Sequence, residues 1–62
     1  MSSQLSNRAK KAISAELKLQ DCYREMAAEA NNPKVQAVIH DLLLMEEMNE
    51  VLLRSLNQSL TA

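Results

Sequence analysis

The segment Asn31-Asn32-Pro33 is the strongest turn signal in a 62-residue chain that has no glycine and no other proline. Asparagine tolerates the left-handed conformation found at the C′ position after a helix, so Asn31 is expected to end one helix in that conformation. Asn32 suits the N-cap of a following helix, and Pro33 suits its first position, where a missing N–H costs nothing. The sequence therefore predicts three segments: a helix over about 4–30, a turn at 31–32 and a helix over 33–60.

The composition favours an all-α fold with a single domain spanning residues 1–62. Tyr23 is the only aromatic residue, and the abundant residue types, such as Leu, Ala, Glu and Met, are those of long helices. A chain this small buries only about 60% of its unfolded surface, and its single cysteine, Cys22, has no internal disulfide partner. We therefore expect the chain to complete its core with another copy of itself, as a homo-oligomer that is at least a dimer.

Charge and hydropathy exclude two classes of partner. The formal net charge is −1, so the chain lacks the basic surface of a nucleic-acid-binding protein. No apolar run approaches the roughly 18 residues that span a bilayer, and the first residues lack the apolar stretch of a signal peptide. We expect a cytoplasmic protein with neither nucleic acid nor membrane as a partner.

Both predicted helices carry a stripe of residues in alternating steps of four and three, the spacing that faces a neighbouring helix. The first stripe consists of Leu5, Ala9, Ala12, Glu16, Leu19, Tyr23, Met26 and Ala30. The second consists of Val35, Ile39, Leu42, Glu46, Asn49, Leu53, Leu56 and Leu60. A further apolar row of Val38, Met45 and Leu52 makes the second helix too widely apolar for one neighbour. Two antiparallel hairpins packed as a four-helix bundle would cover it.

The centre of each stripe is polar. In an antiparallel hairpin that turns at residue 31, Glu16 and Glu46 fall at the same height, and Asn49 lies one turn from Glu46 on the same face. Two hairpins would then bring four glutamates and two asparagines into one interior. Such carboxylates must be neutralised by protons, by basic side chains or by metal ions, and neither stripe contains Lys or Arg.

Two interpretations of this polar layer remain open. Glutamates facing one another across helices are a common way for a bundle to hold divalent ions, which makes the layer a candidate metal site. Alternatively, a polar residue at a core position of paired helices fixes their register and oligomeric state, and asparagine is the best-attested example. In that case the chain is a non-catalytic helical hairpin for oligomerisation or interaction.

The pattern of Glu16, Tyr23, the Asn-Asn-Pro turn and Glu46 in "MEEMN" resembles the ferritin-like superfamily. It is most similar to encapsulated ferritins and rubrerythrin-like two-helix hairpins, which dimerise into a four-helix bundle around a di-iron site. The resemblance implies that Glu16 and Glu46 are metal ligands and that Tyr23 lies beside the site. Asn49 stands where the family has histidine.

The resemblance implies iron as the ion and ferroxidase activity as the reaction. An amide oxygen at Asn49 is a weaker iron ligand than imidazole and suits harder ions, so Mn²⁺, Ca²⁺ and Mg²⁺ are alternatives, with Zn²⁺ a further one. The expected function is therefore metal binding or iron handling in the interior of a dimer.

Overall fold

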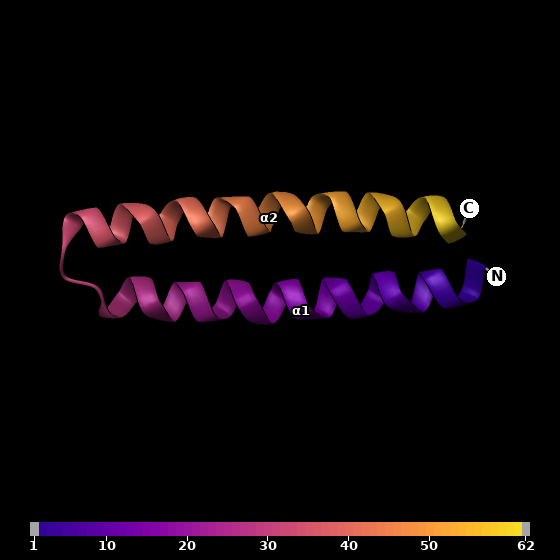
Figure 1. Cartoon of the computed structure of the whole chain (residues 1–62), viewed down its shortest axis with the longest axis horizontal. Coiled ribbons are helices and arrows are strands. Elements are labelled where there is room, and N and C mark those ends of the chain that lie inside the picture. Colours follow the sequence, from indigo (N-terminus) through magenta and orange to yellow (C-terminus); the bar gives the residue numbers. More distant parts are fainter. Residues whose placement is uncertain (1, 62) are drawn as a thin grey trace.

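The structure, a computed structural model, is a hairpin of two antiparallel α-helices, α1 (Ser2–Glu29) and α2 (Pro33–Thr61) (Figure 1). It describes the backbone of residues 2–61 and the side chains of residues 4–61. The Cα atoms extend over 47 × 14 × 11 Å with a radius of gyration of 14.4 Å. A globular domain of this length has a radius of gyration of about 11 Å, so the hairpin is elongated. The predicted all-α hairpin is confirmed.

The turn places Asn32 at the N-cap of α2. Its side-chain Oδ1 accepts hydrogen bonds from the backbone N–H groups of Lys34, at 2.9 Å, and Val35, at 3.3 Å. The Asn32 carbonyl also accepts the first bond of the helix, from Gln36 N at 2.9 Å. The predicted cap is therefore confirmed, and it satisfies two of the N–H groups that a helix start leaves unpaired.

The expected left-handed conformation of Asn31 is wrong, because no residue between Ser2 and Thr61 has a positive φ angle. The last bond of α1 runs from Ala30 N to Met26 O at 3.0 Å. The free carbonyl of Ala30 then accepts a 2.6 Å bond from the side-chain Nε2 of Gln36. A side chain thus satisfies the Ala30 carbonyl, and the chain passes through the turn without a left-handed residue between Ser2 and Thr61.

The line of contact between α1 and α2, the seam, covers only part of each predicted stripe. Ala9 and Ile39 are the only buried apolar residues among those described. The stripe members that are at least partly covered are Ala9, Ala12, Glu16, Tyr23 and Ala30 on α1, and Ile39, Leu42, Glu46, Leu53 and Leu60 on α2. Their neighbours in the seam are Ser6, Ile13, Gln20 and Ala27 on α1, and Leu43, Glu50 and Asn57 on α2. The seam is consequently small and polar for a helix–helix contact.

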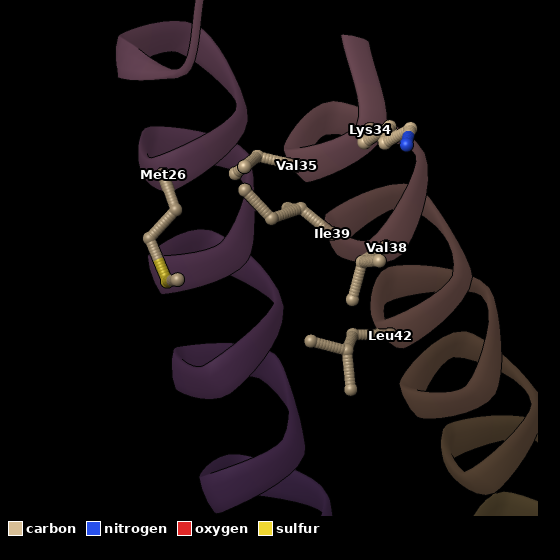
Figure 2. A pocket seen from close by; sticks show the side chains of 6 residues that line it. All are labelled: Met26, Lys34, Val35, Val38, Ile39 and Leu42. Carbon is tan, nitrogen blue, oxygen red and sulfur yellow. The ribbon is translucent and has the colours of Figure 1, made fainter. Parts of the chain in front are cut away.

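The remaining apolar members of the two stripes lie on one open side of the hairpin, which we call the apolar face. Met26 on α1 and Val35 and Leu42 on α2 line a single groove on this side (Figure 2). Large apolar residues exposed on the apolar face and on the α2 row beside it are Leu5, Leu19, Met26, Val35, Leu56, Val38, Met45 and Leu52. The single hairpin therefore leaves uncovered the surface that the stripes predicted to be buried.

The opposite side of the hairpin is closed by charged residues, and we call it the charged face. Arg24 of α1 pairs with Glu47 of α2 across the helices at 3.4 Å. Arg54 pairs with Glu50, one turn away on α2, at 2.7 Å. The hairpin thus has a hydrophobic side and a side with charged pairs, although Leu17, Leu44, Met48 and Val51 are also exposed outside the apolar face and its row.

No helix in the described part of the chain is long and apolar enough to cross a bilayer.

Candidate metal-binding site

Glu16 and Glu46 face one another across the middle of the seam. Both are half-buried, and they lie close enough for the negative charge of Glu46 to raise the pKa of Glu16. Glu16 belongs to α1 and Glu46 to α2, so their meeting depends on the antiparallel register that the turn establishes. The structure therefore brings together the two acids that the sequence placed at one height.

Glu16 is the least satisfied polar group of the seam. Its Oε2 atom is buried and has no hydrogen-bond partner. Partial burial and the neighbouring carboxyl groups of Glu46 and Glu50 raise the pKa of Glu16 above its ordinary value of 4.5. The site therefore favours a proton, or another cation, at this carboxyl group.

Asn49 lies beside Glu46 on the open side of the seam. Its side-chain Nδ2 donates a hydrogen bond to Glu46 Oε1 at 3.2 Å, and the residue is exposed. Asn49 follows Glu46 by three positions along α2, which makes the two residues neighbours on one face of the helix. Glu16, Glu46 and Asn49 thus form one polar cluster at mid-height, as the sequence predicted.

Gln20 is a member of this cluster that the sequence analysis missed. It is 2% exposed, and its Nε2 donates to the backbone carbonyl of Glu46 at 3.3 Å and to Glu50 Oε1 at 3.0 Å. Its Oε1 accepts a bond from Arg24 Nη2 at 3.4 Å. Gln20 therefore ties the two helices together one turn from Glu16. The sequence signal that could have identified Gln20 was its position directly after Leu19, a member of the predicted stripe.

Glu50 has the opposite electrostatic character to Glu16. Hydrogen bonds from Gln20 and Arg54, together with the charges of Arg54 and Arg24, lower the pKa of Glu50 below 4.5 and outweigh its partial burial. Glu50 is consequently held as a carboxylate toward the charged face. Its partners occupy it, so it is a poorer candidate for a ligand than Glu46.

A single hairpin does not complete a metal site. Among residues 2–61, no three or more His, Cys, Asp or Glu side chains come together in a group that could hold a metal ion. Glu16 and Glu46 supply two carboxylates, and divalent ions in proteins take at least four ligands. A site at this position therefore needs further oxygen ligands from a second chain or from water.

Tyr23 lies in the seam two helical turns from Glu16, and its side chain is half-buried. Two turns correspond to about 10 Å along the axis, which is beyond direct contact with an ion held by Glu16. Tyr23 therefore contributes packing to the seam, and a role beside the metal remains a prediction.

Comparisons with models of protein families, with curated proteins and with solved structures each find no match for this chain. The resemblance to ferritin-like hairpins thus stays a prediction that rests on the residues quoted above.

Proposed function

We propose that this chain is one half of a ferritin-like four-helix bundle that binds divalent metal ions between two copies. Glu16 and Glu46 of each copy would supply the carboxylates, and the amide oxygen of Asn49 would be a weak additional ligand. The observation that carries this proposal is the buried, unpartnered Oε2 atom of Glu16, which faces a second carboxylate in the middle of the seam.

The exposed area supports pairing of two hairpins. The accessible surface is 4792 Å², whereas a compact monomer of 7.0 kDa exposes about 4000 Å². The excess of about 800 Å² is similar to the area that each partner contributes to a standard interface, also about 800 Å². Much of the exposed apolar surface belongs to the apolar face and the α2 row beside it, so a second copy packed there would bury it.

The charges around the cluster support a cation as its missing component. The nearest basic side chains already have partners, since Arg24 pairs with Asp21 and Glu47, and Arg54 pairs with Glu50. In the dimer the cluster would hold four carboxyl groups away from bulk water. Ionised carboxylates in such a place repel one another and require neutralisation by protons or by metal ions.

The donor atoms decide which ions fit. Carboxylates and an amide oxygen are hard ligands that suit Mg²⁺, Ca²⁺ and Mn²⁺, and carboxylates alone also bind Fe²⁺. Iron is the ion that the family resemblance implies, and when bound it would supply one-electron oxidation by dioxygen. Glu16 and Glu46 would then bind and charge-balance the ion, which is the role of carboxylates in di-iron bundles.

Elemental analysis tests the proposal directly. The protein, purified without chelator and dialysed against Fe²⁺ without oxygen or against Mn²⁺, should retain about two ions per dimer. A Glu16→Gln, Glu46→Gln variant keeps the shape of both side chains without their charge and should retain none. An Asp21→Asn variant removes an exposed acid of α1 and is the matched control. Equal metal content in all three proteins would contradict the proposal.

A second candidate, an interaction module without metal, is favoured by the polar contacts elsewhere in the seam. Ser6 Oγ donates to Asn57 Oδ1 at 3.3 Å near the open end of the hairpin, and Gln20 spans the seam near its centre. Contacts of this kind fix the register of two helices. On this account Glu16 and Glu46 would share a proton, and no ion would change the stability of the protein.

A further inference from the structure

Two rows of exposed residues border the apolar face, one on each helix. On α2 the row consists of Val38, Met45 and Leu52, which are 60%, 63% and 61% exposed. On α1 the equivalent row lies three positions after the apolar-face residues Leu5, Leu19 and Met26. It repeats with the same seven-residue spacing. It consists of Arg8, Ala15, Cys22 and Glu29, all exposed. A hairpin packed on the apolar face would bring its own two rows against these.

We propose that a second copy packs on the apolar face with its α1 antiparallel to α1 and its α2 antiparallel to α2. The two-fold axis crosses the hairpin at the level of Glu16 and Glu46. This inference rests on the dimer proposed above and specifies its symmetry and contacts.

The α2 row is complementary to itself in this arrangement. An antiparallel pairing centred on Met45 places Val38 against the partner's Leu52, and Met45 against the partner's Met45. Every contact along the row is then apolar. Burying large apolar side chains against one another is the main favourable contribution to such an interface.

The α1 row is also complementary to itself, by charge and by size. Antiparallel pairing places Arg8 against the partner's Glu29 at both ends, and Ala15 against the partner's Cys22 between them. Neither Arg8 nor Glu29 takes part in an ion pair within the described hairpin. The small residues at the centre allow the two helices to approach closely, and the charges at the ends set their direction.

The other two-fold arrangement, in which α1 packs against the partner's α2, matches these rows less well. At the register of the hairpin, Arg8 would be level with residue 54 of the partner's α2, beside Leu52, where its charge would lose water without gaining an opposite charge. Glu29 would be level with residue 33, beyond the end of the apolar row and near Lys34, which lines the same groove as Val38. Only one of the two charges would then find a partner. The self-pairing of each helix is therefore the better fit.

The two rows give nearly the same position for the two-fold axis. The α1 row has its midpoint between Lys18 and Leu19, and the α2 row has its midpoint at Met45. Because Glu16 and Glu46 share one level of the hairpin, both midpoints lie within about 4 Å of that level along the helix axes. The axis thus brings both copies of Glu16 and Glu46 into one layer, as a shared metal site requires.

Disulfide trapping tests this arrangement with the cysteine that the chain already has. In an Ala15→Cys variant, the new thiol should form a disulfide with the partner's Cys22 when oxidised glutathione accepts the two electrons. The two cysteines of one chain are two turns apart, about 10 Å, which is too far for an internal disulfide. We expect a covalent dimer on a non-reducing gel as the main species.

Three controls accompany this variant. The parent, a Ser14→Cys variant and an Ala15→Cys, Cys22→Ser variant should all remain monomeric on the gel. Ser14 is exposed but lies about 100° around α1 from Ala15, away from the row, and the last variant lacks Cys22. If the protein sediments as a dimer but Ala15→Cys forms no disulfide-linked dimer, this arrangement is wrong. The same holds if Ser14→Cys forms as much of it as Ala15→Cys does. Neither result contradicts the metal-binding dimer proposed above. A monomer by sedimentation overturns both.

A charge exchange provides an independent readout. Arg8→Glu should weaken the dimer roughly tenfold, because each of two ion pairs becomes a repulsion. Adding Glu29→Arg to the same chain should restore the parent dissociation constant. An Arg8→Glu variant with the dissociation constant of the parent, or no restoration by the second change, contradicts the proposed pairing.

Discussion

The side-chain amide of Asn49 donates a hydrogen bond to Glu46 Oε1 at 3.2 Å, so Asn49 orients one of the two central carboxylates. Asn49 is exposed on the side of the hairpin that the proposed partner would cover. It therefore lies at the boundary between the seam and the proposed dimer interface, where a ligand to a shared ion would be needed.

This position makes Asn49→His the most informative single substitution for the choice of metal. Imidazole is a stronger ligand than an amide oxygen for Fe²⁺ and Zn²⁺, so we expect the affinity for these ions to rise at least about tenfold. Isothermal titration under anaerobic conditions measures the change. Asn49→Ala is the control and should not strengthen binding. An unchanged affinity in a folded Asn49→His protein would show that Asn49 does not adjoin the ion.

The raised pKa of Glu16 predicts a characteristic dependence of stability on pH. A carboxyl group whose pKa is higher in the folded state contributes stability that is fully present below its unfolded pKa, near 4.5, and is lost as pH rises through the folded value. In the metal-free protein, Glu16→Gln should therefore raise the melting temperature at pH 7 and have less effect at pH 4.

The matched control for this experiment is Glu50→Gln, because the pKa of Glu50 is lowered. Its carboxylate contributes stability above pH 4.5 that is lost as pH falls through the lower folded value, so this variant should be less stable than the parent at pH 7. Thermal melts with chelator across this pH range compare the two variants. The same sign of effect for both at pH 7 would contradict the assigned environments.

The apolar face predicts different effects for two methionines of equal exposure. Met45 and Met48 are 63% and 62% exposed in the hairpin, but only Met45 belongs to the row beside the apolar face. Met45→Glu should dissociate the dimer because it places two carboxylates against each other at the axis, whereas Met48→Glu should leave it intact. Sedimentation equilibrium at micromolar concentration distinguishes these outcomes, and equal behaviour of the two variants would argue against the interface.

The turn predicts a difference between two adjacent asparagines. Asn32 accepts hydrogen bonds from Lys34 N and Val35 N, so Asn32→Ala should lower the free energy of unfolding by about 1 kcal/mol. Asn31→Ala removes no such cap and should change it by less than about 0.5 kcal/mol. Chemical denaturation of both variants provides the comparison, and similar losses at the two positions would show that the cap is not the stabilising element.

The sequence predicted the turn and both helices because their signals are local. Asn32 and Pro33 fix the start of α2 through their own hydrogen-bonding chemistry and φ preference, and no distant residue is needed. The meeting of Glu16 and Glu46 was also predictable, since the position of a short turn determines which residues share a level.

The sequence did not separate the seam from the apolar face. A repeat of seven residues describes a stripe that faces more than one neighbour, and it does not state which neighbour belongs to the same chain. Gln20 and Asn57 were missed for this reason, because each adjoins an apolar stripe residue, Leu19 or Leu56, that turns outward instead. Which residues of a stripe enter the seam depends on the rotation of each helix, which packing determines.

Thermal melting with and without metal ions tests the central claim that Glu16 and Glu46 bind metal. The parent and a Glu16→Leu, Glu46→Leu variant are melted with chelator and with Fe²⁺ (anaerobically), Mn²⁺, Ca²⁺, Mg²⁺ or Zn²⁺.

An ion at one hundred times its Kd stabilises the folded state by about 2.7 kcal/mol, which raises the melting temperature of a domain of this size by about 10 °C or more. We predict this rise for the parent with at least one ion, and no rise for the variant, which should melt higher than the parent in chelator because an apolar layer replaces buried acids. A parent whose melting temperature is the same with every ion and with chelator would contradict the account and leave the polar layer as a device for pairing helices.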